Sequence, residues 1–272
     1  MKNIYYILLA GLIMLMSCSN ASQPNDPIPE HETFKIKSEK IGEDRVINVW
    51  VPENYKNSSD SLPIMYMADG GIKEDFPHIA NTLEKLIKEN RIKPIILVGI
   101  ENTQRRRDLT GFTEVEKDKE IAPVVGGSEK FRMFIKEELF PEINKRYRTK
   151  NEKTIIGESA SGLFVMETFF LSPEMFDNYI AFDPSLWWNN HYLVSTAIGH
   201  LEKFPTTEKR IWFASSKATD VSPYTKELAH IFKSENRTNI KWNYSYEPKE
   251  KHHTIFRATK EKAIVWTLNK IE

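Results

Sequence analysis

The sequence predicts an α/β fold in which a mostly parallel sheet is covered by helices on both faces. Two short apolar runs, at 63–68 and 94–100, suit strands that are buried on both sides. Two segments before them alternate apolar and charged residues, which indicates antiparallel strands. From about residue 150 onward, strand and helix patterns alternate. This order favours a parallel sheet with its functional residues at the carboxyl ends of the strands.

The antiparallel strands are expected at 34–41 and 45–51, with a turn around Gly42. The two buried strands enclose a first helix, whose apolar residues recur at helical spacing: Ile79, Leu83, Leu86 and Ile87. A second helix is marked in the same way by Phe131, Phe134, Ile135, Leu139 and Ile143. Pro141 falls inside that second pattern and is expected to bend the helix.

The second half of the chain repeats the alternation. Strands are expected at 153–156, 178–182, 210–215 and 240–246, and helices at 159–171, 223–233 and 259–269. Ser222 and Pro223 form a favourable helix start, because a hydroxyl caps the first turn and proline suits the first helical position. No internal repeat or shift in composition indicates a second globular domain.

The composition fits one domain and excludes several functional classes. The chain has 272 residues, of which 40% are hydrophobic, enough for a substantial core. The 38 Lys and Arg residues balance the 38 Asp and Glu residues, so the overall charge gives no reason to expect nucleic acid or anionic lipid as a partner. The chain has one cysteine, which excludes a zinc ribbon or a disulfide framework. No metal and no cofactor is expected.

The N-terminus predicts export and a lipid anchor. A basic start is followed by an apolar run at 4–16, which matches a secretory signal and is short for a membrane span. The run ends in Leu-Met-Ser-Cys, which resembles a bacterial lipobox and makes Cys18 the expected lipidation site. We therefore expect a signal peptide at 1–17, a flexible tether at 18–32 and the α/β domain at 33–272, with membrane contact only through the lipid. An ordinary signal peptide with an incidental cysteine is the alternative.

A candidate nucleophile lies between a strand and a helix. Residues 157–162 read Gly-Glu-Ser-Ala-Ser-Gly, directly after one expected strand and directly before a helical pattern. This context predicts the nucleophile elbow of α/β hydrolases, a tight turn that exposes a serine. Ser159 is the candidate nucleophile, with Gly157 at the preceding small position and Ser161 where a second glycine is usual. An ordinary serine at a helix N-terminus is the alternative interpretation.

The candidate general base follows the last expected strand. His252 and His253 stand together in the loop after 240–246, and His252 is preferred. The order of serine before histidine agrees with an α/β hydrolase. The histidine must accept the serine proton and later donate it to the leaving alcohol, so its pKa needs to lie near neutrality.

Three carboxylates are candidates for the acid that orients the histidine. Asp220 is preferred, because it follows the strand before the last strand by a few residues. Asp183, at the end of the preceding strand, and Glu250, beside the histidines, remain competitors. A site without an acid, a Ser–His dyad, also remains open.

For the oxyanion hole we expect backbone N–H groups of Ala160, directly after the nucleophile, and of Gly70 in the loop after an early strand.

These motifs resemble the putative-esterase family of α/β hydrolases, which includes siderophore esterases, feruloyl esterases and acetyl-xylan esterases. The resemblance covers residue 46 to the C-terminus and rests on the segments 63–70, 107–110, 131–148, 157–164, 183–188 and 250–254. The Asp-Pro-Ser-Leu-Trp-Trp segment at 183–188 is most similar to the siderophore-esterase-like branch. The resemblance implies that Ser159 is the nucleophile and His252 the base, and that Asp69 and Gly70 with Ala160 frame the oxyanion.

The substrate expected is a small-molecule or glycan ester outside the cytoplasm, either a siderophore lactone or an aromatic or acetyl glycan ester. Trp187 and Trp188 offer flat apolar surface for an aromatic acyl group or a sugar, and Asp69 and Arg107 are further candidates for substrate contact. The predicted function is a serine carboxylic-ester hydrolase. The rival hypothesis is a non-catalytic lipoprotein that keeps the hydrolase fold to bind a glycan or siderophore.

Overall fold

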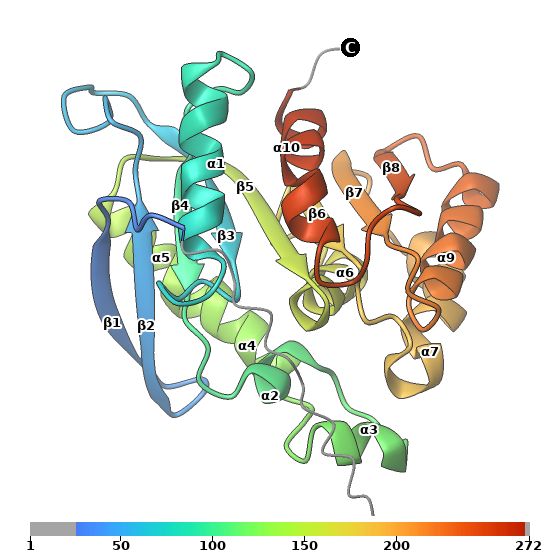
Figure 1. Cartoon of the computed structure of the whole chain (residues 1–272). Helices are drawn as coiled ribbons and strands as arrows, with labels where there is room; N and C mark the ends of the chain where they lie inside the picture. The colour runs from blue at the N-terminus through green and yellow to red at the C-terminus, as the bar shows by residue number, and fades with distance from the viewer. Residues whose placement is uncertain (1–25, 270–272) are drawn as a thin grey trace, which may run out of the picture.

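A computed structural model describes residues 26–269, in which one eight-stranded sheet runs through the centre (Figure 1). The strands are β1 (Glu32–Ser38), β2 (Glu43–Trp50), β3 (Leu62–Met67), β4 (Ile96–Ile100), β5 (Thr149–Glu158), β6 (Asn178–Phe182), β7 (Lys209–Ser215) and β8 (Ile240–Tyr246). Their order across the sheet is β1-β2-β4-β3-β5-β6-β7-β8. The pairs β1–β2 and β2–β4 are antiparallel, and all later pairs are parallel. This is the mixed sheet that the sequence predicts.

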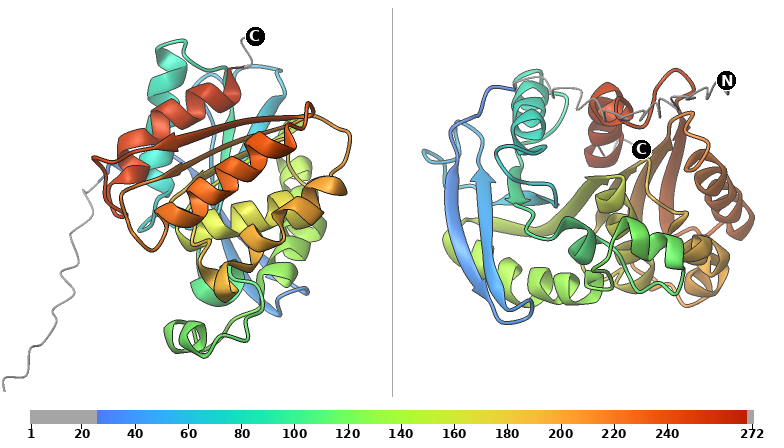
Figure 2. Two further views of the ribbon diagram at one scale, coloured as in Figure 1. Left: turned by 90° about the vertical axis from the view of Figure 1, so that its right-hand side faces the viewer. Right: turned by 60° about the horizontal axis from the view of Figure 1, so that its bottom comes forward.

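Helices cover both faces of the sheet, which Figure 2 shows nearly edge-on in its left view. One face carries α1 (Phe76–Lys88) and α10 (Ile255–Leu268). The other carries α4 (Ser128–Phe134), α5 (Phe140–Arg146), α6 (Ala160–Leu171), α8 (Ala197–Glu202) and α9 (Ser222–Glu235). Short helices α2 (Arg105–Leu109) and α3 (Glu116–Ile121) follow β4, and α7 (Trp188–Ser195) follows β6. Each face encloses its own apolar core, so the central strands are buried on both sides.

The helix predicted around 131–143 is interrupted where the proline stands. A π-helical segment, η1 (Ile135–Leu139), lies between α4 and α5, and Pro141 occupies the first turn of α5. Proline lacks an N–H group and cannot donate to the preceding turn, so the expected bend takes the form of a π-helical turn.

The helix α9 includes Ser222 as its first residue, and no side chain caps it. The helices between 188 and 202 were not predicted.

The segment before β1 is fastened to the domain. The Asp26 carboxylate forms an ion pair with Arg257 of α10 at 2.6 Å, and the Asn81 amide of α1 donates to the Pro27 carbonyl at 2.8 Å. Residues 26–31, which the sequence assigns to the flexible tether, therefore pack on the helical face of α1 and α10. Cys18, the signal peptide and the rest of the tether lie outside the described residues. No helix among residues 26–269 is long and apolar enough to cross a membrane.

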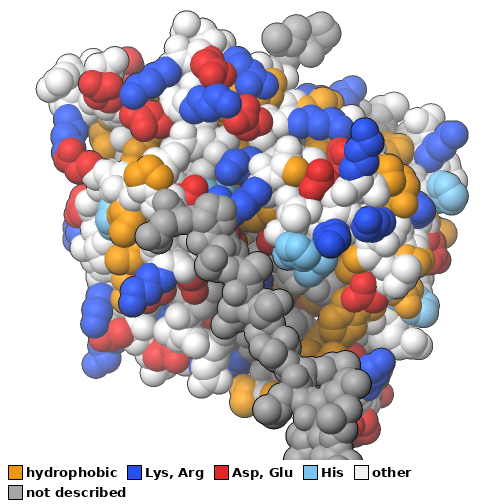
Figure 3. Space-filling view, viewed as in Figure 1, with side chains coloured by type: hydrophobic (Ala, Val, Ile, Leu, Met, Phe, Trp, Pro, Cys, Tyr) orange, Lys and Arg blue, Asp and Glu red, His pale blue; other side chains and the backbone are white. Residues whose placement is uncertain are grey.

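The surface carries charges of both signs. On the face in Figure 3, basic and acidic side chains are interspersed and alternate with small apolar patches. This agrees with the zero formal net charge of the chain.

Candidate active site

The segment around Ser159 forms a strained turn between β5 and α6. Ser159 has φ 59° and ψ −117°, in a region that residues with a side chain rarely adopt. Gly157 makes the turn possible, because a Cβ there would lie 2.6 Å from the backbone carbon and oxygen of Ser161. The strand, the turn and the helix thus have the arrangement that the elbow motif predicts.

Ser161 closes this turn. Its Oγ accepts a hydrogen bond from the Glu158 N–H and donates one to the Glu158 carbonyl oxygen, both at 2.8 Å. The side chain is buried and points back to the strand. Ser161, which stands where glycine is usual, therefore stabilises the turn through its hydrogen bonds to Glu158. Ser159 is the serine that contacts the histidine.

His252 and Ser159 meet at the carboxyl end of the sheet. The His252 Nε2 atom lies 3.0 Å from the Ser159 Oγ atom, and the ring is partly open to solvent, with 43% of its side chain exposed. The loop that carries it is held by Thr254, whose hydroxyl donates to the Glu250 carboxylate at 2.7 Å. Glu250 is therefore engaged in shaping the loop. His253 is exposed beside it.

The carboxylate that contacts His252 is that of Asp183, so the preference for Asp220 is corrected. Asp183 Oδ2 lies 3.1 Å from His252 Nδ1, while Oδ1 accepts a hydrogen bond from the Ser216 N–H at 2.6 Å. Asp220 is exposed, and among the described residues it forms no hydrogen bond with His252. The reason lies in the sheet. β6 is the direct neighbour of β5, so the residue after β6 falls beside the elbow, whereas Asp220 stands well beyond the end of β7, just before α9, and is exposed.

The surroundings of His252 favour its charged form. The hydrogen bond to Asp183 raises the pKa of the imidazole, burial lowers it, and the negative charges of Glu158 and Asp183 raise it further. The balance places the pKa of His252 above its usual value of 6.5. The ring thus remains a base near neutral pH while binding the serine proton more firmly than a free histidine.

One of the two expected oxyanion donors is available. Ala160 is the first residue of α6, where the helix leaves the backbone N–H without an intrahelical partner. The Gly70 N–H instead donates to the Ile100 carbonyl at 3.0 Å, so its expected role is corrected. Glycine is needed at position 70 for packing, because a Cβ there would lie 2.3 Å from the Gly99 Cα atom of β4.

Asp69 holds an arginine rather than offering a free carboxylate. Its two oxygens accept hydrogen bonds from Arg105 Nε and Nη2 at 2.5 and 2.8 Å, and Asn102 donates to one of them at 2.6 Å. Burial raises the pKa of Asp69, but the hydrogen bond and charge of Arg105 outweigh this and hold the pKa below its usual value. Arg105 also approaches the Glu158 carbonyl at 3.5 Å, so its guanidinium lies at the rim of the elbow.

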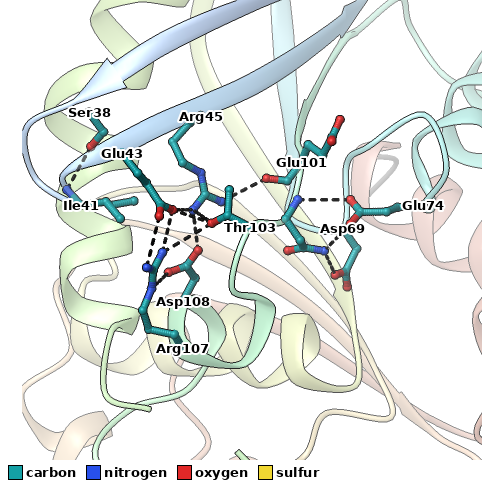
Figure 4. A network of polar contacts seen from close by, with 11 residues as sticks. Ser38, Ile41, Glu43, Arg45, Asp69, Glu74, Glu101, Thr103, Arg107 and Asp108 are labelled. Carbon is teal, nitrogen blue, oxygen red and sulfur yellow. Dashed lines mark hydrogen bonds and ion pairs between the residues drawn. The ribbon is translucent and has the colours of Figure 1, made fainter. Parts of the chain in front are cut away.

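Arg107, expected to contact substrate, belongs to a structural network. Its guanidinium binds Glu43 of β2 and the neighbouring Asp108, each at 2.7 Å (Figure 4). Asp108 also binds the fully buried Arg45 at 2.5 Å. Arg107 lowers the pKa of Glu43 to about 2, mainly through their hydrogen bond. The network ties α2 to β2, and the arginine that faces the site is Arg105.

The two tryptophans stand at the start of α7, which follows β6. Trp188 is buried and donates its indole N–H to the Gly111 carbonyl at 3.0 Å, while Trp187 is half-buried with its ring 5.8 Å from that of Trp188. Trp188 lines a cavity of about 820 Å³ together with Leu163 and Glu167 of α6. Neither Trp187 nor Ser159 lines this cavity. Among residues 26–269, no cluster of three or more His, Cys, Asp or Glu side chains has the arrangement of a metal site.

Comparisons with known proteins identify a family and several relatives of this chain. A family model described as "Putative esterase" matches residues 38–267. The ferri-bacillibactin esterase BesA of Bacillus subtilis (strain 168) is 37% identical over 114 residues, covering 37% of this chain and 39% of that protein. The siderophore triacetylfusarinine C esterase of Aspergillus fumigatus is 28% identical over 192 residues, covering 65% and 63%. The chain thus spans less than two thirds of the length of these relatives.

Solved structures confirm the α/β-hydrolase fold. An IroE-like serine hydrolase from Shewanella oneidensis has a TM-score of 0.78 and 26% identity, covering 87% of this chain and 79% of that chain. The BES protein from Bacillus cereus has a TM-score of 0.77 and 22% identity, covering 88% and 96%.

Proposed function

Because the chain belongs to the putative esterase family, we propose that it is a serine carboxylic-ester hydrolase. In this proposal Ser159 is the nucleophile, His252 the general base and Asp183 the acid that orients the base. The observation that carries the proposal is the continuous contact from Ser159 Oγ through His252 to Asp183, at 3.0 and 3.1 Å. A chain that only binds a ligand has no need for this hydrogen-bonded series at a strained elbow.

Each residue has a defined task in the reaction. His252 accepts the Ser159 proton at Nε2 as Oγ attacks the ester carbonyl, and the Ala160 N–H stabilises the oxyanion that forms. The imidazolium then protonates the departing alcohol, which leaves an acyl group on Ser159. Water, deprotonated by the same histidine, releases the acid and restores the serine. Asp183 fixes the tautomer through Nδ1 and stabilises the imidazolium.

We propose siderophore esters as the substrate class. The relatives named above are a ferri-bacillibactin esterase and a siderophore triacetylfusarinine C esterase. Arg105 supports an anionic substrate, because Asp69 fixes its guanidinium at the rim of the elbow while 38% of its side chain remains exposed. A catecholate or carboxylate group next to the scissile ester would pair with this cation.

The test compares three ester classes on purified protein: a cyclic catecholate trilactone, a feruloyl sugar ester and an acetylated xylan fragment. We expect the trilactone to be hydrolysed with the highest kcat/KM. Preference for either sugar ester would contradict the substrate assignment and leave the hydrolase assignment standing. Binding of the trilactone without release of acid from any ester would support the non-catalytic alternative.

Ser159→Ala is expected to lower kcat by about 10⁶ while the protein remains folded, because the hydroxyl supplies the attacking atom and contributes little packing. Ser185→Ala is the matched control: its hydroxyl lies 3.5 Å from that of Ser159, and it is expected to retain most activity. An active Ser159→Ala protein together with an inactive Ser161→Ala protein would transfer the role to Ser161.

We also propose that the protein is exported and anchored by a lipid on Cys18. The support is the apolar run at 4–16 followed by the lipobox-like Leu-Met-Ser-Cys. Metabolic labelling with a palmitate analogue should mark the wild-type protein and leave Cys18→Ala unlabelled. Equal labelling of both proteins, or of neither, would contradict the anchor.

A further inference from the structure

Strand β8 is an edge of the sheet, and its outer side has no partner strand. It pairs with β7 over its whole length, from Ile240 to Tyr246, and among residues 26–269 no strand lies on its other side. The left view of Figure 2 looks onto this edge, with α10 on one side of the strand and α9 on the other. Unpaired main-chain groups along such an edge form a template for a further strand.

The main-chain bonds to β7 show which residues of β8 face outward. The Asn239 carbonyl accepts a hydrogen bond from the Lys209 N–H at 2.9 Å, and the Glu247 N–H donates to the Ser215 carbonyl at 2.8 Å. The odd-numbered residues of β8 therefore direct their N–H and C=O groups to β7, and the even-numbered residues direct theirs away from it. Within the described part of the chain, the residues that have both groups free at the outer side are Trp242, Tyr244 and Tyr246.

The opposite edge of the sheet is protected by charge, whereas the β8 edge is not. β1 carries exposed charged side chains at Glu32, Lys35 and Lys37. Charges along an edge strand oppose its pairing with another chain. β8 has one charged residue within its bounds, Lys241, and no proline. Its outward-pairing residues are all aromatic, and aromatic residues favour strand pairing. The β8 edge thus has the composition of a strand that accepts a partner.

A second copy of β8 is complementary to this edge in an antiparallel orientation. The free groups meet only in registers that place even-numbered residues opposite even-numbered residues. When Tyr244 faces Tyr244 of the second copy, Trp242 faces Tyr246, because the two residues lie equally far from Tyr244 on either side. All the free main-chain groups of these residues are then paired. The same register places Lys241 opposite Glu247 of the second copy, since each lies three residues from Tyr244.

The charges distinguish this register from its two neighbours. With Asn243 on the twofold axis, Lys241 would face Ser245 and have no acidic partner. With Ser245 on the axis, Lys241 would approach Lys249, which has the same charge. Only the register with Tyr244 on the axis places an acid opposite Lys241, and opposite charges on facing positions stabilise a strand pair.

We propose that two copies of this chain associate through antiparallel pairing of their β8 strands about a twofold axis at Tyr244. The two sheets then form one continuous sheet, and each copy contributes the same residues to the contact. Trp242 lies on the α9 face, where its ring is 5.7 Å from that of Phe232, so the aromatic pairs form on this face. Glu247 lies on the α10 face, where it binds Lys262 at 2.9 Å, so the lysine–glutamate pairs form there. The contact involves no catalytic residue and does not rest on the proposed function.

The first test measures the mass of the whole purified chain by analytical ultracentrifugation over a range of concentrations. Wild type is expected to approach twice the mass of one chain as the concentration rises. Lys241→Glu should raise the dissociation constant of the dimer by about tenfold, because an acid then faces an acid at two symmetric positions. Combining Lys241→Glu with Glu247→Lys exchanges the two charges and should restore the wild-type constant.

The matched control is Lys35→Glu, the same charge change on the exposed edge strand β1. It should leave the dissociation constant unchanged. A wild-type chain that remains monomeric at every concentration would overturn the proposal and leave the edge to a different partner. A dimer that Lys35→Glu weakens as much as Lys241→Glu, or that the exchanged charges fail to restore, would also overturn it.

Disulfide cross-linking tests the register without changing a charge. In the Cys18→Ala background, Tyr244→Cys places the two thiols on the axis, where facing Cα atoms are about 5.5 Å apart and within the range of a disulfide. Tyr246→Cys is the control, because its two copies lie four residues apart along the pair, on the order of 13 Å. Mild oxidation should link the Tyr244→Cys chains and leave the Tyr246→Cys chains single. Equal linking in both variants, or none in the Tyr244→Cys protein, would overturn the proposed pairing.

Discussion

Among residues 26–269, two histidine–aspartate pairs have nearly equal distances, but their surroundings shift the histidine pKa in opposite directions. His252 Nδ1 lies 3.1 Å from Asp183, and His78 Nε2 of α1 lies 2.9 Å from Asp75. The His252 side chain is 43% exposed, whereas that of His78 is 1% exposed. The pKa of His252 is raised, and burial, opposed only in part by Asp75, lowers that of His78.

The difference lies in what faces the second ring nitrogen. Beyond His252 is the Ser159 hydroxyl, with Glu158 nearby as a further acid. Beyond His78 is the Lys260 ammonium group, 3.2 Å from Nδ1, whose positive charge disfavours the imidazolium. A histidine bound to a carboxylate is thus not a catalytic signature by itself. The exposure of the ring and the group on its other side decide whether it exchanges protons.

The largest expected difference between the pairs is in rate. His252→Ala should lower kcat by about 10⁶, comparable to loss of the nucleophile, because the serine proton then has no acceptor. His78→Gln should keep kcat within about threefold, since His78 contacts Asp75 and Lys260 and not Ser159. Steady-state hydrolysis of a chromogenic ester measures both. A comparable loss of kcat in a folded His78→Gln protein would break the comparison.

The next effect separates the carboxylates. Asp183→Asn should lower kcat by up to about 10⁴, because an amide facing Nδ1 stabilises the wrong tautomer. The pKa of His252 should fall in the same variant, so the acidic limb of the profile should move to lower pH. Asp220→Asn should leave kcat nearly unchanged. If the two variants exchange these results, the acid is Asp220 after all.

The smallest effect concerns stability and belongs to His78. Its pKa is lowered in the folded protein, so below about pH 6.5 the unfolded chain takes up a proton that the folded chain refuses. Stability from this residue is therefore present above pH 6.5 and is lost as the pH falls. Urea unfolding of wild type at pH 7 and pH 5 should show this loss, and His78→Gln should show less of it. An equal loss in both proteins would assign the acid sensitivity elsewhere.

The features that the sequence predicted are those set by local pattern. Strand and helix periodicity gave β6 and β8 with the observed bounds, and the Gly-Glu-Ser-Ala-Ser-Gly segment gave the elbow at Ser159. His252 followed from the chain order of serine and histidine. The strands and the elbow depend on residues close together in the chain, and the histidine depends only on the order of the elements, which a single sequence also carries.

The errors concern residues whose role depends on neighbouring strands. Asp183 precedes a proline, which normally favours extended backbone, yet it adopts a left-handed φ of 38° that directs its carboxylate to His252. Asp183 lies beside the elbow because β6 is the neighbour of β5 in the sheet. The periodicity of the sequence predicts the strands but does not predict their order in the sheet. Gly70 looked like an oxyanion donor, but it is glycine because β4 passes against it.

Arg105, and not the predicted Arg107, faces the site, and the cause is the geometry of a short helix. The two residues lie in α2, where positions two apart point in directions about 200° apart. One arginine faces Asp69 at the elbow and the other faces Glu43 on β2. The helix has five residues, too few for a periodic pattern, so the sequence alone did not assign a face to either arginine.

The ion pair between Asp26 and Arg257 joins the segment before β1 to the helix that follows the histidine loop. Arg257 lies in the first turn of α10, and Asn81 of α1 holds the neighbouring Pro27 carbonyl. His252 lies three residues before α10, whereas Ser159 lies between β5 and α6. The segment before β1 is therefore fastened to the same helix that carries on from the base, and the nucleophile is fixed independently by the sheet.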